Sequence, residues 1–379
     1  MPLRFLTSSQ GWPYLLVPLI PIAIVLEIAH AGPVVLFLTS ALGVIPTAAL
    51  MGKATEELAA RSGPGVGGLL NVTFGNAPEI IIALFALNKG LHEVVKASLV
   101  GSILGNILLV MGASMLVGGL RRDRQYFDRS AASAQSLMLL LAIAALVVPA
   151  IFELVEGKGL PAPGSEIVNY DSTVEHLSLA VAIVLLVTYA CGLLFSLKTH
   201  RSLFNPAAGE GKGLGEEGEV GEEHEEPWPI RKAVIALAVA GVAVGVMSEI
   251  LVGSISEAAE SIGLSEFFVG IIVVAIVGNA AEHWVAVLVA AKNKMDLAVN
   301  ISIGSSAQIA LFAIPVLVLC SFFIGPHPMP FVLNGFELGA IILAVVIANH
   351  VTNEGESHWF EGVQLLAVYA VLALGFYFA

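Results

Sequence analysis

The sequence is dominated by long apolar runs of about 20 residues, the length that an α-helix needs to cross a bilayer. Only 12% of its residues are charged and 57% are hydrophobic, whereas soluble domains carry about 25% charged residues. A soluble globular fold is therefore excluded, and we expect an all-α integral membrane protein with eleven transmembrane helices. The predicted spans are 12–31, 33–52, 65–87, 93–119, 131–151, 174–197, 230–252, 265–291, 297–325, 331–349 and 359–378.

The distribution of Lys and Arg supports this number of spans. With a cytoplasmic N-terminus, 14 of the 17 basic residues fall on the cytoplasmic side, and only Lys89, Lys96 and Lys158 fall on the other. Membrane proteins show this bias, and one missing span would scramble it. The sequence therefore predicts a multi-pass membrane protein with its N-terminus inside and its C-terminus outside. The first run also loosely resembles a signal peptide, whose removal would leave ten spans in the same orientation.

An acidic segment from Gly209 to Pro227 divides the apolar runs into two groups. It holds eight of the thirty acidic residues, interspersed with glycines. Such a composition predicts a cytoplasmic linker, acting either as a solvated spacer or as a weak cation-attracting surface. The formal net charge of −13 argues against a nucleic-acid partner.

The two groups of spans repeat one another. Gly75-Asn76-Ala77-Pro78-Glu79 and Gly278-Asn279-Ala280-Ala281-Glu282 are 203 positions apart, and Gly101-Ser102 matches Gly304-Ser305 at the same offset. Each repeat contains five spans, and this odd number inverts the second repeat relative to the first. Inverted repeats are typical of transporters that bind their substrate near the membrane midplane. The predicted organisation is a leading transmembrane helix (1–32), a first five-helix repeat (33–198), the acidic cytoplasmic linker (199–229) and a second five-helix repeat (230–379).

Two glutamates, Glu79 and Glu282, lie near the middle of apolar runs at equivalent repeat positions. A charged residue there costs roughly 2.5–3.5 kcal/mol on insertion scales, so it is expected to face the protein interior and serve a site. Carboxylate and carbonyl oxygens suit a hard cation such as calcium, which takes six to eight oxygen ligands. The sequence therefore predicts a cation site that contains both glutamates.

Backbone carbonyls are further candidate ligands. Pro78 has no N–H, so it frees the carbonyl of Phe74 from its helical bond, and Gly75 loosens the same turn. In the second repeat Ala281 stands in place of the proline, so we expect a milder break beside the equivalent Gly278.

Other polar residues lie on or near the same spans. Ser102, Ser305 and Gln308 are predicted to line the site, although small residues also serve close helix packing. His283 follows Glu282 and is interpreted either as a proton carrier or as a helix-interface residue. Glu56 and Glu257, at or beyond the ends of two spans, are gating or entrance candidates or simply interfacial charges. Glu249 lies deeper in its span and is interpreted as a functional gating or entrance residue.

Paired carboxylates suggest antiport. Two close glutamates cannot both stay ionised in a low-dielectric site without a cation, so protons must replace a departing metal ion. An intramembrane enzyme is not expected, because the sequence has no HExxH motif and its aspartates lie near loops. We expect no prosthetic cofactor; calcium and protons are the expected transported ions, and the lipid bilayer is the expected surrounding.

These motifs resemble the two alpha repeats of the cation/proton exchanger family, within the calcium/cation antiporter superfamily. The resemblance extends to Gly-Lys-Ala-Thr-Glu-Glu at 52–57, Ser-Glu-Ile-Leu-Val-Gly-Ser at 248–254 and Gly-Ser-Ser-Ala-Gln at 304–308. It implies a fold of one leading helix plus two five-helix repeats, and exchange of cytosolic calcium for protons. The residues that it implies for cation or proton binding are Glu79, Glu282, Asn76, Asn279, Ser102, Ser305, Gln308 and His283. The compact termini resemble prokaryotic members, which implies a cell-membrane location.

The alternatives are a sodium/calcium exchanger of the same superfamily and a cation channel. Sodium/calcium exchangers typically carry a carboxylate or asparagine where this sequence has Ser102 and Ser305. The ranking of transported ions, the stoichiometry and the oligomeric state stay open at the level of sequence, and a homo-oligomer is one of the options.

Overall fold

The computed structural model describes residues 11–164, 170–195, 198 and 228–379, so the acidic segment Gly209–Pro227 lies outside it. Helices make up most of the described chain. The α-helices are α2 (Leu19–Ile28), α3 (Pro33–Gly75), α4 (Ala77–Asn88), α5 (His92–Leu104), α6 (Met111–Gly119), α7 (Arg129–Leu146), α8 (Val148–Val155), α9 (Ser172–Leu194), α11 (Ile230–Ile262), α12 (Glu266–Phe268), α13 (Ala275–Ala291), α14 (Met295–Val299), α15 (Ser305–Gln308), α16 (Ile314–Cys320), α17 (Gly335–Thr352) and α18 (Trp359–Phe378). Four π-helical segments and one 3-10 turn adjoin them: η2 (Gly105–Val110), η5 (Val269–Val274), η6 (Asn300–Gly304), η7 (Ile309–Ala313) and η1 (Trp12–Leu16).

The described residues contain nine helical stretches long and apolar enough to cross a membrane, or ten if one bent pair is a single span. The bent pair is Leu69–Gly75 with Ala77–Asn88, and Trp12–Ile28 is apolar but shorter. The prediction of an all-helical membrane protein is therefore confirmed. The nine stretches are Pro33–Ser62, His92–Gly119, Arg129–Val155, Ser172–Leu194, Ile230–Ile262, Glu266–Ala291, Met295–Cys320, Gly335–Thr352 and Trp359–Phe378.

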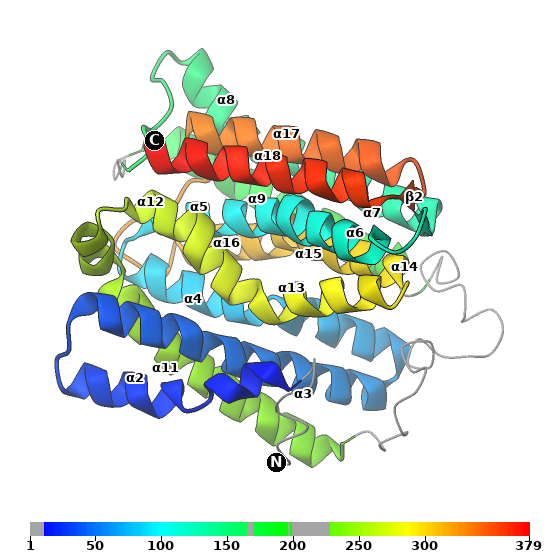
Figure 1. Cartoon of the computed structure of the whole chain (residues 1–379). Coiled ribbons are helices and arrows are strands. Elements are labelled where there is room, and N and C mark those ends of the chain that lie inside the picture. Colours follow the sequence, from blue (N-terminus) through cyan, green and yellow to red (C-terminus); the bar gives the residue numbers. More distant parts are fainter. Residues whose placement is uncertain (1–10, 165–169, 196–197, 199–227) are drawn as a thin grey trace.

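The helices pack with α3 and α11 crossing at one side of the molecule and α17 and α18 lying together at the opposite side (Figure 1). Helices α4, α5, α13 and α16 lie between these two pairs (Figure 1). At this crossing Gly43 packs against α11: a methyl group there would lie 2.8 Å from the sulfur of buried Met247, so that side chain would have to shift. The apolar core is contiguous across both halves of the chain.

Helix α3 is 43 residues long, but its chain doubles back on itself. A methyl group on Gly67 would lie 3.3 Å from the Cα of Ala59, whereas eight residues of straight helix would separate the two positions by about 12 Å. The element therefore contains the end of one predicted span and the start of the next. The first leg, Pro33–Ser62, is longer than the predicted span 33–52.

Polar caps fix where several helices begin. Asn334 accepts the N–H of Glu337 and Glu337 accepts the N–H of Asn334, a capping box that starts α17 at Gly335 rather than at the predicted 331. At the start of α9 the backbone N–H of Thr173 donates to Asp171 over 2.9 Å, which lowers the pKa of the Asp171 carboxyl. Asn334 and Glu337 have the spacing of a capping box in the sequence, but the predicted span 331–349 followed the apolar residues and included both.

A small antiparallel sheet joins two loops that the sequence did not predict to pair. Strand β1 (Gln125–Tyr126) pairs with β2 (Glu356–Ser357), with Gln125 opposite Ser357 and Tyr126 opposite Glu356. Gln125 is buried, and its amide donates to the carbonyl of Ala290 at the end of α13 over 3.0 Å. The sheet therefore links the loops before α7 and α18 to the helix that carries Glu282.

Two substitutions in this sheet are expected to differ in their effect on stability. Gln125→Ala removes the two hydrogen bonds that the buried amide donates, to the carbonyl of Ala290 and to Oδ1 of Asn293. The carbonyl of Ala290 keeps the N–H of Asn293, so the cost should be that of two lost hydrogen bonds, about 1–3 kcal/mol of unfolding free energy. Arg124→Ala removes only an exposed ion pair with Glu356, at 2.7 Å, so its apparent melting temperature should change little. Thermal unfolding of both variants in detergent tests this, and an equal loss would contradict it.

Candidate functional site

Glu79 and Glu282 come from different repeats and lie together in the structure. Glu79 belongs to the first turn of α4 and is buried, whereas Glu282 belongs to the middle of α13 and is half-buried. A methyl group on Gly278 would lie 3.4 Å from the Cγ of Glu79, so the Glu79 side chain packs directly against the backbone of α13. The two carboxylates interact electrostatically. The structure thus brings the two sequence-predicted acids into one site.

The first repeat is broken beside Glu79, as Gly75 and Pro78 lead one to expect. The chain bends by 43° between the segments Leu69–Gly75 and Ala77–Asn88. The N–H of Asn76 turns back to the carbonyl of Phe74 at this bend, and Pro78 occupies the first turn of α4. Glu79 therefore lies at the N-terminus of a half-helix, where unpaired backbone N–H groups favour negative charge.

The second repeat has no such break, contrary to the milder one that we expected. Helix α13 runs without interruption from Ala275 to Ala291, through Gly278 and Glu282. Ala281 keeps the N–H that a proline would lack, so the helical hydrogen bonds continue. The irregular backbone lies one turn earlier, in the π-helical segment η5. The carbonyl of Gly278 consequently lies within a continuous helix, unlike that of Phe74.

A chain of hydrogen bonds connects the two repeats around the glutamates. The hydroxyl of Ser305 lies 3.2 Å from Oδ1 of Asn76 and 3.3 Å from Oε2 of Glu282, and it can donate to either. Nδ2 of Asn76 donates to Oε1 of Gln308 over 2.9 Å. In the equivalent place, Nδ2 of Asn279 donates to the hydroxyl of Ser102, also over 2.9 Å. Each asparagine thus contacts the serine of the opposite repeat.

The segment that carries Ser305 and Gln308 is short and unusual. Helix α15 comprises only Ser305–Gln308, and π-helical segments lie directly before and after it. The π-helical segment η2 likewise follows Ser102 by three residues. Such segments occur often at functional sites, because the wider turn leaves backbone and side chains in non-standard positions. Composition gives no signal for them, and the sequence did not predict them.

Two oxygens at the site have no protein partner within the described part of the chain. Oε2 of Glu79 and Oδ1 of Asn279 are both buried and accept no hydrogen bond there. Buried polar atoms of this kind are rare and call for a ligand or a proton. No group of three or more His, Cys, Asp or Glu side chains that could hold a metal ion occurs among these residues. A cation here would therefore depend on neutral oxygens as well as on the two carboxylates.

The entrance candidates differ in their relation to the site. Glu56 on α3 has an exposed side chain and interacts electrostatically with Glu282. Glu249 and Glu257 on α11 are also exposed. Of the three entrance candidates, Glu56 is thus the one with an interaction with a site carboxylate among the described residues.

His283 contacts a residue that sequence reasoning did not include in the site. Its Nε2 lies 3.0 Å from Oδ1 of Asn106, which is buried at the start of η2. The available signal was a lone carboxamide inside an apolar run, four residues after Ser102. The contact joins residues 177 positions apart, so no local pattern could pair them.

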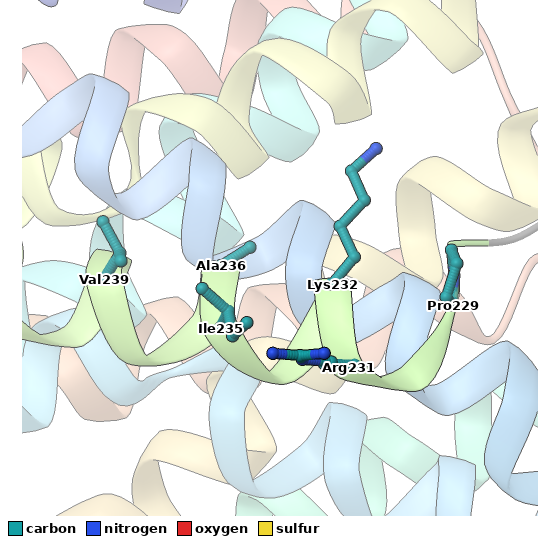
Figure 2. Close-up of a pocket in the computed structure, with 6 residues that line it drawn as sticks. All are labelled: Pro229, Arg231, Lys232, Ile235, Ala236 and Val239. Atoms are coloured by element: carbon teal, nitrogen blue, oxygen red, sulfur yellow. The ribbon is translucent and has the colours of Figure 1, made fainter.

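A surface groove lies near the start of α11 (Figure 2). It is lined by Pro229, Arg231, Lys232, Ile235, Ala236 and Val239. Apolar side chains beside two cations are typical of a membrane–water interface. The groove contains none of the predicted site residues.

Comparison with known proteins gives consistent results over the whole chain. A family model described as sodium/calcium exchanger protein matches residues 32–198 and 232–378. The chain is 44% identical over 352 residues to a Ca2+/H+ antiporter of Synechocystis sp., covering 92% of both proteins. It is 43% identical over 359 residues to the Ca2+/H+ antiporter ChaA of Bacillus subtilis, covering 94% of this chain and 96% of that protein. A crystal structure of the Ca2+/H+ antiporter protein YfkE superposes with a TM-score of 0.78 at 38% identity, covering 97% of this chain and 99% of the other.

Proposed function

The chain belongs to the cation/proton exchanger family of the calcium/cation antiporter superfamily, and on this premise we propose that it is a calcium/proton antiporter. It is a multi-pass membrane transporter rather than an enzyme. The observation that carries the proposal is the meeting of Glu79 and Glu282 from opposite repeats in one polar site. Its transported ions are calcium and protons, as the names of these relatives state for them.

The arrangement of donors and acceptors accounts for mutual exclusion of calcium and protons. With calcium bound, both carboxylates are ionised and their charges are neutralised by the metal ion. When calcium leaves, two adjacent carboxylates must take up protons, because like charges cannot both persist in a low-dielectric site. The ligands proposed for the ion are oxygens of the side chains of Glu79, Glu282, Asn76 and Asn279. Backbone carbonyls of the broken turn at Phe74 and Gly75 are further proposed ligands.

Ser305 is suited to follow the protonation of Glu282. Its single hydroxyl proton can serve only one acceptor at a time. An ionised Glu282 accepts this proton, whereas a protonated Glu282 donates to Ser305 and leaves the hydroxyl to Asn76. The same side chain thus supports both states of the site without moving.

The full topology that we propose has eleven spans, with Trp12–Ile28 in the leading one and two inverted repeats of five after it. The repeats comprise 33–198 and 230–379, joined by the cytoplasmic linker 199–229. The positive-inside bias supports a cytoplasmic N-terminus. Glu56 then lies at the cytoplasmic entrance and attracts calcium toward Glu282.

Uptake measurements in proteoliposomes test the function. Vesicles with an acidic interior should accumulate calcium while their internal pH rises, and the uptake should not require sodium. Uptake that depends on a sodium gradient and ignores the pH gradient would establish a sodium/calcium exchanger instead. Calcium flux without any proton movement would establish a channel.

Ser305→Ala should raise the calcium concentration needed for half-maximal exchange about tenfold, because Glu282 and Asn76 lose a shared hydrogen-bonding partner. Initial exchange rates against calcium concentration measure this. Ser302→Ala is the matched control, since the Ser302 hydroxyl is buried but donates to Ala298 of its own helix over 2.9 Å. Equal shifts in the two variants would contradict the assigned role of Ser305.

A further inference from the structure

Two of the positions at which the repeats differ lie close together beside the site. At the repeat offset of 203, Gln308 corresponds to Gly105, and His283 corresponds to Ile80. Gln308 accepts a hydrogen bond from Asn76, whereas Gly105 has no side chain to offer to Asn279. Asn279 therefore lacks the partner side chain that Asn76 has in Gln308.

The imidazole of His283 lies over the position that Gly105 leaves empty. A methyl group on Gly105 would be 3.8 Å from Cε1 of His283, which is ordinary van der Waals contact. Any side chain longer than alanine at position 105 would compete with the ring for this space. The glycine of the first repeat therefore makes room for a histidine of the second.

Asn106 holds the ring in that place. Its buried Oδ1 lies 3.0 Å from Nε2 of His283, a hydrogen-bonding distance. In the other repeat the residues equivalent to His283 and Asn106 are Ile80 and Ile309. Ile309 is buried in the apolar core and Ile80 packs against it. A polar pair on one side of the site thus takes the place of an apolar pair on the other.

We infer that Asn106 is a positioning residue for His283. Its carboxamide keeps the imidazole over Gly105 and away from the adjacent carboxylate of Glu282. Without this acceptor, the half-buried ring can leave the Gly105 space and obstruct the path of the ion to Glu282. Asn106 contacts neither glutamate in the hydrogen bonds of the site, so it acts through the histidine. This role rests on the exchange function proposed above.

A double-mutant cycle with isoleucine tests the inference, because it copies the apolar pair of the other repeat. The variants are Asn106→Ile, His283→Ile and the double variant, each compared with the wild type in proteoliposomes. We expect Asn106→Ile to lower the maximal exchange rate about tenfold, the usual effect of an unpaired buried polar group. The double variant should be no slower than the slower single variant. Once the imidazole is absent, residue 106 has no ring to position, so changing it should cost nothing further. Equilibrium calcium binding should change less than threefold, since the ligand oxygens remain.

Two further measurements distinguish positioning from a general structural role. His283→Gln keeps an N–H donor for Asn106. With Asn106 present, His283→Gln should therefore retain more exchange activity than His283→Ile. With isoleucine at position 106, the two substitutions at position 283 should give the same activity. Asn106→Ala serves in place of Asn106→Ile if the larger residue prevents folding. If a change at 106 lowers the rate by the same factor in the wild-type background and in the His283→Ile background, the inference is wrong. A wild-type protein without calcium/proton exchange would instead refute the proposed function.

Discussion

Glu282→Gln should abolish calcium/proton exchange, with a loss of at least about 100-fold in the initial rate. Glutamine preserves the shape of the side chain, but it removes one of the two charges that balance a divalent cation. Removing one partner of a buried ionic interaction costs about 3–5 kcal/mol, which corresponds to a factor of 100 or more in affinity. Glutamine also cannot exchange a proton for a metal ion, so raising the calcium concentration should not restore coupling.

Glu79→Gln should have the same consequence through the other repeat. Glu79 is 9% exposed, and its Oε2 has no hydrogen-bonding partner among the described residues. Its carboxylate is therefore available to a cation or a proton. Because the amide is neutral, the substitution should not harm folding, and the purified variant should remain monodisperse in detergent.

Glu260→Gln is the matched control for both variants, since Glu260 is an exposed glutamate near the end of α11. It should keep exchange close to the wild-type rate. Uptake of calcium driven by a pH gradient measures all three proteins under one condition. Substantial exchange in Glu282→Gln or Glu79→Gln would show that the two carboxylates are not the shared binding site.

The sequence was most informative where one physical constraint dominates a whole segment. Apolar length predicted the nine long apolar helices of the described residues, and the equal spacing of Glu79 and Glu282 predicted that two distant acids belong to one site. Pro78 and Gly75 predicted the break in the first repeat correctly. Each of these inferences depends on residues close together in the chain, or on an offset that can be read directly.

The sequence was least informative where the geometry depends on contacts between distant residues. The pairing of His283 with Asn106 and of β1 with β2 depends on how helices and loops meet in space. The unbroken α13 has a related cause: the motif resembles that of the first repeat, but one alanine keeps the helical hydrogen bonds intact. The π-helical segments on either side of Ser305–Gln308 likewise have no signal in the local sequence.

A GxxxG motif formed by Gly101 of α5 and Gly105 of η2 illustrates the same limit, because its two glycines look alike in sequence. A methyl group on Gly101 would collide with the carbonyl of Ile271 and lie 2.9 Å from the Cβ of Ala275. A methyl group on Gly105 would meet nothing closer than the His283 ring at 3.8 Å. Only Gly101 is therefore needed for the close approach of α5 to η5 and α13.

Gly101→Ala should consequently destabilise the protein by about 3 kcal/mol, since neither backbone can move without disturbing its own helix. Gly105→Ala should be neutral or stabilising by up to about 1 kcal/mol, because alanine favours the helix. Thermal unfolding in detergent should place the two variants on opposite sides of the wild type, and similar melting temperatures would contradict this packing. Gly101 also directly precedes Ser102, which accepts the hydrogen bond from Asn279 over 2.9 Å. Forcing α5 away from η5 should therefore lengthen this contact and lower exchange in any Gly101→Ala protein that still folds.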